Sequence, residues 1–210
     1  MNPVDPPVPE SSVYALFLAA GLSSRFVSDK LLYPLDGRPL VAHAATAVAQ
    51  AVAGGILWGA VAVVPWGATT LAWQLDTLGM QLVPNPDPAR GLSESLRLGL
   101  AALEQAGAGA ALVVLADQPL LRVEVISALV RHWQSTGRSV RPRYGDSPDT
   151  PGHPVLLDRS LWRHAHGLRG DVGLGRELRR HGEPIDEIPV PGGNPDIDTP
   201  ADLHRLEGTS

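Results

Sequence analysis

Short apolar runs that alternate with helix-like segments constrain the fold of this chain more than any other feature. The apolar runs have the length of buried strands, and they are residues 13–18, 59–64, 80–83 and 111–115. The helix-like segments are residues 38–53, 69–78, 93–105 and 123–135. Strands that alternate with helices at this spacing form βαβ units. The pattern predicts an α/β fold with a Rossmann-like, doubly wound and mostly parallel sheet.

The pattern loosens after Gly137. We expect two extended segments within residues 139–158, two short helices near 159–166 and 172–181, an edge strand at 185–190 and a final helix that starts at Thr199-Pro200. We therefore predict a single domain over residues 13–210. The Pro-rich residues 1–12 are expected to form a disordered tail.

Charge and cysteine content argue against several classes of function. The formal net charge is -5 at pH 7, whereas sequence-independent nucleic-acid binding needs a basic surface. The chain has no cysteine, so disulfides, thiolate metal sites and cysteine nucleophiles are excluded. No apolar stretch reaches the roughly 18 residues needed to cross a bilayer. These features predict a cytoplasmic protein that binds neither nucleic acid nor membrane.

The loop after the first apolar run carries the only lysine of the chain, Lys30, among 17 basic residues. Lysine is a compact charge on a flexible stem, and arginine is a planar fork, so a site that follows a phosphate can require lysine. The same loop contains Gly21, Ser23 and Arg25, which suit close approach of an anion. Its spacing matches neither the dinucleotide fingerprint nor the P-loop. The loop therefore predicts a phosphate site of another kind.

Two carboxylates are candidate metal ligands. Asp117 directly follows the apolar run at 111–115, so it is expected at the ligand edge of the sheet. Asp198 lies in the segment DIDTPADL, whose Asp196 is a neighbouring carboxylate. Mg²⁺ prefers one or two carboxylates together with phosphate oxygens and water. The alternative for Asp117 and for Asp198 is the N-cap of the helix that follows.

Ser93 and Ser95 lie at the predicted start of a helix, where backbone amides favour an anion. Capping by Ser93 would account for that residue without a ligand. His164 and His166 form an H-x-H pair, but the other histidines and the carboxylates do not fall at the spacing of a zinc site.

Several strings along the chain together resemble the molybdenum cofactor nucleotidyltransferases, the MobA/MocA-like group. These are LAAGLSSRFVSDKLLYPLDGRPLV, NPDPARGLSESLRLGL, VVLADQPLL, GHPVLLD, RGDVG and DIDTPADL, in the family's order. The double-alanine form LAAG is similar to the cytidylyl branch. The resemblance implies a nucleotide-diphospho-sugar transferase-like three-layer sandwich. It also implies transfer of CMP from CTP to the terminal phosphate of molybdopterin, with release of pyrophosphate.

The resemblance also implies roles for individual residues. The nucleotide-binding set is Leu18, Ala19, Ala20, Gly21, Ser23, Arg25, Lys30, Asn85, Gly91, Ser93, Ser95 and Asp117. Lys30 and Arg25 would act on the phosphates, and Asp117 and Asp198 would hold Mg²⁺, with Mn²⁺ as the alternative metal. His153 and Asp171 would lie on the acceptor side. A molybdenum hydroxylase is a candidate partner, and a monomer or weak homo-oligomer is expected.

Three alternatives stay open at this point. The enzyme could use GTP or ATP on the same fold, or it could take a sugar-phosphate or polyol-phosphate acceptor. It could also be a non-catalytic molybdenum cofactor chaperone, which would keep the fold and could lose the phosphate and metal residues.

Overall fold

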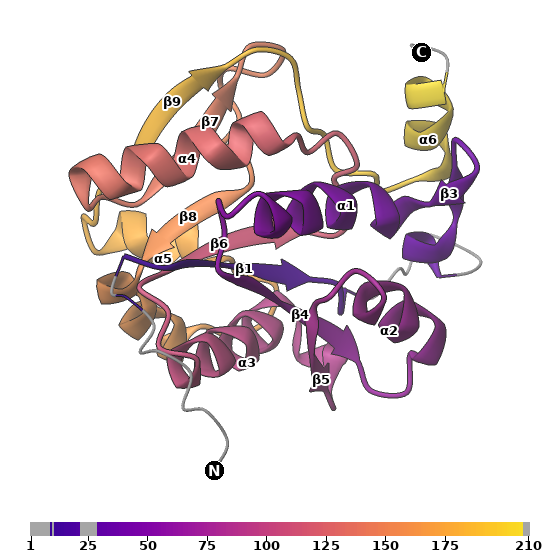
Figure 1. Ribbon diagram of the computed structural model, residues 1–210, viewed down its shortest axis with the longest axis horizontal. Helices are drawn as coiled ribbons and strands as arrows, with labels where there is room; N and C mark the ends of the chain where they lie inside the picture. The colour runs from indigo at the N-terminus through magenta and orange to yellow at the C-terminus, as the bar shows by residue number, and fades with distance from the viewer. Residues whose placement is uncertain (1–8, 10, 22–28, 208–210) are drawn as a thin grey trace.

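A seven-stranded sheet runs through the centre of the molecule (Figure 1). The computed structural model describes residues 9, 11–21 and 29–207, so most of the expected N-terminal tail lies outside the described residues. The strands lie in the order β5-β4-β1-β6-β8-β7-β9. They are β1 (Val13–Leu18), β4 (Gly59–Pro65), β5 (Gln81–Asn85), β6 (Ala110–Leu115), β7 (Val140–Tyr144), β8 (Val155–Asp158) and β9 (Asp186–Val190).

Most neighbouring strands are parallel, which confirms the predicted fold class. β1 pairs in parallel with both β4 and β6, β4 with β5, and β7 with β9. β8 is antiparallel to both of its neighbours, β6 and β7. The carboxyl ends of β1 and β6 therefore meet at one edge of the sheet, where ligands of open α/β sheets bind.

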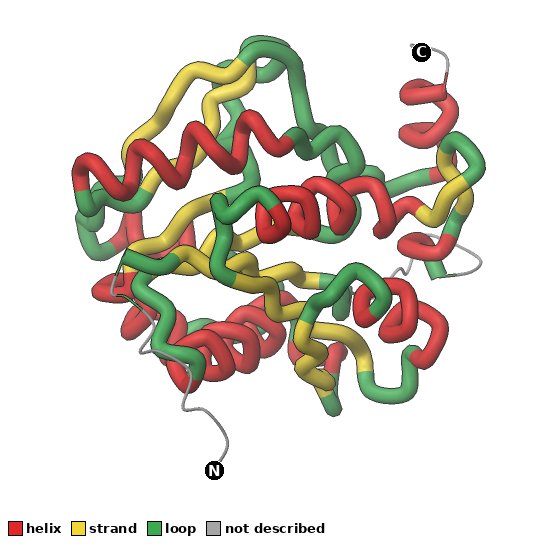
Figure 2. Tube along the Cα trace, in the orientation of Figure 1, coloured by secondary structure: helices red, strands yellow, loops and turns green. Residues whose placement is uncertain are grey.

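Helices cover both faces of the sheet, and Figure 2 shows the loops that join them to the strands. One face packs against α1 (Leu40–Ala53), α2 (Thr69–Asp76) and α4 (Val123–Thr136). The other face packs against α3 (Leu92–Gln105), α5 (Leu174–Arg180) and the 3-10 segment η3 (Arg159–Gly167). Within the described residues, no helix is both long enough and apolar enough to cross a membrane.

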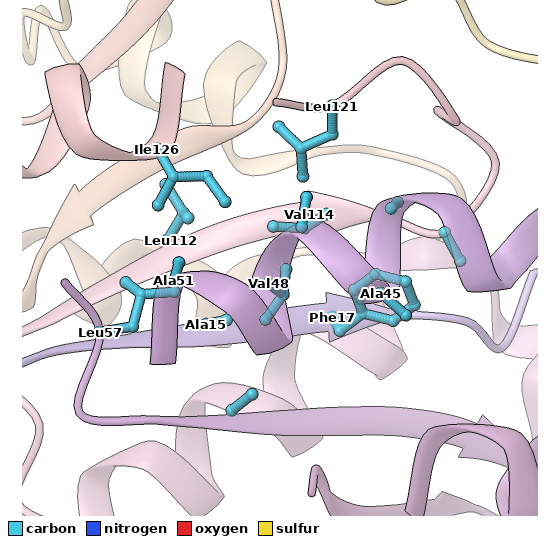
Figure 3. Packing of buried hydrophobic residues seen from close by; sticks show 14 of the residues in the cluster. Ala15, Phe17, Ala45, Val48, Ala51, Leu57, Leu112, Val114, Leu121 and Ile126 are labelled. Atoms are coloured by element: carbon cyan, nitrogen blue, oxygen red, sulfur yellow. The ribbon is translucent and has the colours of Figure 1, made fainter. Parts of the chain in front are cut away.

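Alternation of side chains along the central strands builds both halves of the core. Ala15, Phe17 and Leu112 face α1 and α4, where they meet Val48 and Ile126 (Figure 3). The intervening residues of the same strands face α3 instead. Helix α3 lies so close to β1 that a Cβ on Gly99 would come 2.1 Å from Leu16 Cδ1. A side chain at this position would require either Leu16 or the helix to shift.

The predicted helix at residues 38–53 begins later than expected. Arg38–Pro39 forms strand β3, which pairs with Pro34–Leu35, strand β2. The hairpin turns at Asp36 and Gly37, which both have positive φ, 49° and 75°. Pairing across this turn holds Pro39 in an extended conformation, so α1 starts at Leu40.

A small apolar cluster joins this hairpin to the C-terminal helix α6 (Pro200–Glu207). Leu35 and Leu40 pack there with Ile197 and Leu203, and all four are buried. The cluster fixes the segment that precedes α6, which carries Asp196 and Asp198, beside the start of α1 (Figure 1).

Candidate active site

A cavity of about 530 Å³ opens at the carboxyl ends of β1 and β6. Backbone hydrogen bonds continue the sheet beyond both strands, from Ala19 N to Val63 O (2.9 Å) and from Ala116 N to Leu18 O (3.1 Å). The residues that line the cavity are Leu18, Ala19, Ala20, Gly21, Lys30, Leu31, Pro88, Ala89, Gly91, Leu92, Ser95, Leu115, Ala116, Asp117, Asp171, Asp196 and Asp198. Segments from the whole length of the chain thus meet at this edge.

Lys30 lies against two carboxylates in this cavity. Its Nζ is 2.8 Å from Asp117 Oδ2 and 3.5 Å from Asp198 Oδ1. The lysine opens the 3-10 turn η1 (Lys30–Leu32), and Asp29 Oδ1 caps that turn by accepting from Leu31 N (3.1 Å). Only 11% of the Lys30 side chain is exposed, and water screens its interaction with Asp117 (24% exposed) less than its interaction with Asp198 (54% exposed).

Backbone contacts bring Asp198 to Asp117 across the molecule. Ile197 N donates to Asp117 O (3.0 Å), and the Ile197 side chain is buried in the cluster that anchors α6. The start of α6 is capped by Asp202, whose Oδ2 accepts from Asp198 N (3.1 Å) and Thr199 N (2.7 Å). One oxygen of the Asp198 carboxylate, Oδ1, lies beside Lys30 Nζ.

Asp196 is a third carboxylate at this edge, and the site residues expected from the sequence did not include it. Its Oδ1 accepts from Gln118 Nε2 (2.7 Å), and Gln118 Oε1 in turn accepts from Asn194 Nδ2 (3.2 Å). Burial raises the pKa of the Asp196 carboxyl, and the charge of Asp117 adds to that effect. Its position in DIDTPADL, two residues before Asp198, was the available sequence signal.

The donor set fits a magnesium ion that is also bound by a nucleotide. Asp117 and Asp198 both lie beside one cationic group, Lys30 Nζ, so the two carboxylates are neighbours in the cavity. No group of three or more His, Cys, Asp or Glu side chains is arranged to hold a metal among residues 9, 11–21 and 29–207. Mg²⁺ is commonly held by one or two carboxylates, and phosphate oxygens and water complete its coordination.

The N-terminus of α3 forms the opposite wall of the cavity. Its first residues are held by a distant loop, because Leu92 N donates to Asp171 Oδ1 (3.1 Å) and Ser93 N donates to Gly170 O (3.1 Å). Gly91, at φ 82° and ψ -173°, is the N-cap residue, so the alternative that Ser93 caps this helix is wrong. These two amides are already paired, and they do not offer the anion site expected at this helix start.

The structure brings most of the predicted site residues together. Nine of them line the cavity, and they are Leu18, Ala19, Ala20, Gly21, Lys30, Gly91, Ser95, Asp117 and Asp198. Asp171, predicted on the acceptor side, lines the same cavity. Asn85 and Ser93 are buried and do not line it. Ser23 and Arg25 lie outside the described residues.

His153 lines a second, adjoining cavity of about 260 Å³. The two cavities share Leu18, Leu92 and Leu115 as walls. The second cavity combines apolar side chains with the cations Arg141, Arg176 and Arg179, which the site residues expected from the sequence did not include. No single motif marked these arginines, because they come from two elements far apart in the chain.

The surroundings of the His153 imidazole disfavour its charged form. Burial lowers its pKa, against the opposing effect of the Asp117 carboxylate. Its Nδ1 is buried and has no hydrogen-bond partner among the described residues. The main chain is held by Tyr144, whose hydroxyl donates to His153 O (2.9 Å).

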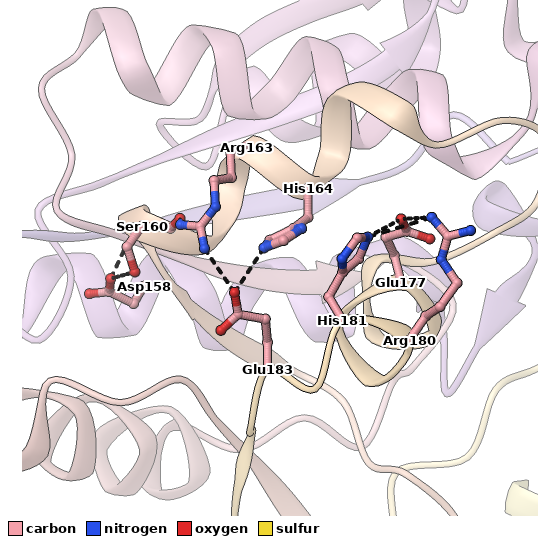
Figure 4. Close-up of polar contacts among 8 residues, drawn as sticks. All are labelled: Asp158, Ser160, Arg163, His164, Glu177, Arg180, His181 and Glu183. Carbon is pink, nitrogen blue, oxygen red and sulfur yellow. Dashed lines mark hydrogen bonds and ion pairs between the residues drawn. The ribbon is translucent and has the colours of Figure 1, made fainter.

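Polar contacts join η3 to the segment that follows α5, the helix of Arg176 and Arg179. Figure 4 shows these contacts at Glu183. Glu183 Oε1 lies 2.8 Å from Arg163 Nη2 and 3.0 Å from His164 Nε2, both on η3. The His164 and His181 rings lie 4.9 Å apart. His164 of the H-x-H pair therefore connects η3 to the end of α5.

Comparison with known proteins gives one family and several relatives. A family model described as the MobA-like NTP transferase domain matches residues 15–185. A phosphoenolpyruvate guanylyltransferase of Sphaerobacter thermophilus is 35% identical over 121 residues, which are 58% of each chain. The bifunctional protein GlmU of Micrococcus luteus is 30% identical over 80% of this chain and 34% of that protein. The chain thus spans 58% and 34% of the lengths of these relatives.

Solved structures share the fold. A crystal structure of Rv0371c from Mycobacterium tuberculosis H37Rv has a TM-score of 0.80 and 25% identity, and the match covers 95% of this chain and 98% of that one. A CMP:2-keto-3-deoxy-manno-octonic acid synthetase complexed with CTP has a TM-score of 0.74 and 14% identity, with 94% and 98% coverage.

Proposed function

This chain belongs to the MobA-like NTP transferase family, and from that premise we propose that it transfers CMP from CTP to the terminal phosphate of molybdopterin and releases pyrophosphate. The observation that carries the proposal is the convergence of Lys30, Asp117 and Asp198 beside the Leu18–Gly21 backbone. The sequence likeness to the cytidylyl branch supports CTP as the nucleotide.

The proposed reaction is a direct displacement at phosphorus. An oxygen of the acceptor phosphate forms a bond to the α-phosphorus of CTP while the bond from that phosphorus to the bridging oxygen of the β-phosphate breaks, and pyrophosphate leaves with that oxygen. The protein supplies position and charge, and no side chain needs to form a covalent intermediate. Lys30 stabilises negative charge on the phosphates, and the Ala19–Gly21 backbone holds the nucleotide.

A magnesium ion would be held by Asp117 and Asp198, and it would neutralise charge on the triphosphate and the leaving pyrophosphate. The charges in the cavity support the need for a metal ion. Asp117, Asp171, Asp196 and Asp198 line it together with the cation Lys30, so it has more acidic than basic groups among the described residues. A triphosphate that enters such a cavity needs additional positive charge.

The second cavity suits the acceptor. Its apolar walls match a flat ring system, and Arg176 and Arg179 match a negatively charged group on the same molecule. It adjoins the nucleotide cavity, because Leu18, Leu92 and Leu115 line both cavities. We assign His153 to the acceptor cavity. We assign Asp171 to the wall of the nucleotide cavity, where its Oδ1 accepts a hydrogen bond from Leu92 N.

A second candidate is transfer of GMP from GTP, and the likeness to a phosphoenolpyruvate guanylyltransferase favours it. Pyrophosphate release separates the two candidates when each of CTP, GTP, ATP and UTP is supplied in turn with molybdopterin or with phosphoenolpyruvate. We expect release above background with CTP and molybdopterin. Release only with GTP would contradict the cytidylyl assignment, and absence of release with every pair would contradict nucleotidyl transfer to these acceptors.

A cofactor chaperone is the non-catalytic alternative, and Asp117→Ala distinguishes it from an enzyme. We expect this variant to lose pyrophosphate release by roughly 100-fold or more, because the nucleotide loses a metal ligand. A chaperone would deliver cofactor to a molybdenum hydroxylase equally well with and without the Asp117 carboxylate. Delivery by the folded variant at the wild-type level, measured as hydroxylase activity, would support the chaperone role.

A further inference from the structure

Asp202, in the first turn of α6, accepts three hydrogen bonds on one carboxylate oxygen. Its Oδ2 accepts from Asp198 N (3.1 Å), from Thr199 N (2.7 Å) and from Thr199 Oγ1 (2.8 Å). A bond to Thr199 N alone would cap the helix, because Thr199 directly precedes its first residue. The bond to Asp198 N reaches one residue further back along the chain. Asp202 therefore holds the backbone of a candidate metal ligand as well as the start of its own helix.

The backbone at Asp198 is fixed from two sides. The preceding amide, Ile197 N, donates to Asp117 O (3.0 Å) in the loop after β6. The Asp198 amide itself donates to Asp202. Asp198 Oδ1 lies 3.5 Å from Lys30 Nζ, but 54% of the Asp198 side chain is exposed, so packing restrains this side chain little. The direction in which its Cα–Cβ bond leaves the fixed backbone therefore decides where the carboxylate can lie.

We propose that Asp202 is a positioning residue for the divalent metal ion of the nucleotide cavity, because it holds the Asp198 carboxylate beside Asp117 before the ion binds. The inference rests on the proposed function in that the cavity has to bind a nucleoside triphosphate together with a metal ion. Among the described residues that line the cavity, Asp198 is present and Asp202 is not, so Asp202 acts through Asp198. A ligand that is already in place loses less conformational freedom when the ion binds.

The test compares the gain in CTP affinity that the metal ion produces. Isothermal titration calorimetry without an acceptor gives the CTP affinity with Mg²⁺ and with EDTA, and the ratio of the two is the metal-dependent gain. Asp202→Ala removes the acceptor of all three hydrogen bonds. We expect the gain to fall roughly tenfold in this variant, while the CTP affinity in EDTA changes by less than about twofold. A gain at the wild-type level in folded Asp202→Ala overturns the proposal.

Asp202→Asn separates position from charge. Asn keeps an oxygen that can accept from Asp198 N and from the two Thr199 donors, but it carries no negative charge. Arg205 Nη1 lies 3.2 Å from the other oxygen, Oδ1, and 77% of the Arg205 side chain is exposed, so water can replace this ion pair in the variant. We expect Asp202→Asn to keep the metal-dependent gain within about threefold of the wild type. Equal losses in Asp202→Asn and Asp202→Ala would assign the effect to charge and overturn the positioning role.

Asp158→Ala is the matched control for the loss of a helix cap. Asp158 Oδ1 accepts from Ser160 N (3.0 Å) and from Ser160 Oγ (2.6 Å) at the start of η3, and Asp158 is not among the described residues that line the nucleotide cavity. We expect this variant to lower the urea midpoint and to keep the full metal-dependent gain. A gain that falls in Asp158→Ala as far as in Asp202→Ala would show a general effect of stability and overturn the proposal.

Asp202→Ser keeps the proposal testable when Asp202→Ala does not fold. The serine hydroxyl oxygen is one bond closer to the backbone than the carboxylate oxygens, so it lies too far from Asp198 N, and the gain should fall as in Asp202→Ala. A wild-type gain in Asp202→Ser overturns the role of Asp202. Failure of the proposed function has a different signature, because wild-type protein would then bind CTP equally with Mg²⁺ and with EDTA, or would not bind it. That result would remove the metal site that Asp202 is proposed to support.

Discussion

The single positive charge of Lys30 lies beside two carboxylates and reduces the repulsion between them. Asp117 and Asp198 both lie within 3.5 Å of it, and the lysine side chain is largely buried. Arginine would meet the same carboxylates with a planar, bulkier head group. A lysine side chain can follow a phosphate by rotation about its stem. The proposed reaction therefore depends on the shape and flexibility of the lysine side chain as well as on its charge.

We predict that Lys30→Ala lowers turnover by roughly 100-fold, on the order of 3 kcal/mol in the barrier. The physical reason is the loss of a positive charge beside the reacting phosphates. Lys30→Arg should also be slow, since the geometry of the head group differs. Pyrophosphate release at saturating substrate measures the effect, and Arg131→Ala on the exposed face of α4 is the control. Unchanged turnover in folded Lys30→Ala would remove this residue from the mechanism.

We predict that the protein loses stability in mild acid because of the His153 imidazole. Burial lowers its pKa in the folded protein, so between that value and the unfolded value of about 6.5 the unfolded chain binds a proton that the folded chain does not. The stability contributed by neutral His153 is complete above about pH 6.5, and it is lost as the pH falls below that value, by at most about 1.4 kcal/mol per pH unit.

His153→Gln should therefore show a flatter dependence of unfolding free energy on pH between about 6.5 and 5. Urea unfolding of the wild type and the variant across this range measures the two slopes. His166→Gln changes an exposed histidine of η3 and should leave the slope as in the wild type. Identical slopes for wild type and His153→Gln would contradict the assignment of a buried neutral imidazole.

At the scale of elements, the loop that contains Gly170 and Asp171 holds α3 in place, and Gly91 makes this contact possible. Gly91 has φ 82° and ψ -173°, a conformation that is essentially restricted to glycine. A Cβ at this position would come 2.5 Å from the backbone carbon of Gly170 and 2.6 Å from Asp171 Oδ1. Close approach of two backbones therefore sets the wall of the nucleotide cavity.

We predict that Gly91→Ala destabilises the protein by roughly 2–4 kcal/mol and weakens CTP binding, because the helix has to move away from the loop. Gly79→Ala is the matched control, since Gly79 also has positive φ (77°), but a Cβ added there would meet no described atom within 4 Å. Gly79→Ala should lower the free energy of unfolding only by the cost of positive φ in a residue that has a Cβ, about 1–2 kcal/mol. Urea unfolding and calorimetric titration with CTP give the two readouts. Equal losses for both variants would show that the contact with Gly170 contributes nothing.

At the scale of the whole molecule, contacts within one segment were predictable from the sequence, and most contacts between distant segments were not. The apolar run at residues 13–18 is β1, because a strand buried on both faces needs little beyond its own composition. The acceptor of the first amide of α3, Leu92 N, could not be predicted, since it is Asp171, which is 79 residues away. Lys30 and Asp117 were expected to be neighbours in space, and they are, since both lie in loops that follow strands whose carboxyl ends share an edge.

The charge of the whole molecule leads to a prediction about divalent ions. The chain carries a formal net charge of -5. Among the described residues, four aspartates and one cation, Lys30, line the cavity. A triphosphate is itself strongly anionic, so its approach is opposed by the field of the protein and by the local carboxylates. A divalent ion held by Asp117 and Asp198 would supply positive charge that offsets this repulsion. Affinity for CTP should therefore depend on the metal far more than affinity for cytidine, which carries no phosphate.

We predict that chelation of divalent ions with EDTA weakens CTP binding by on the order of 100-fold, whereas cytidine binding changes by less than about threefold. Calorimetric titration at constant ionic strength separates this effect from screening. Asp117→Asn removes one of the charges that the metal offsets, so EDTA should matter less in that variant. Equal CTP affinity with and without EDTA in the wild type would mean that the carboxylates do not face the triphosphate, and the placement of the phosphates beside Lys30 would have to be abandoned.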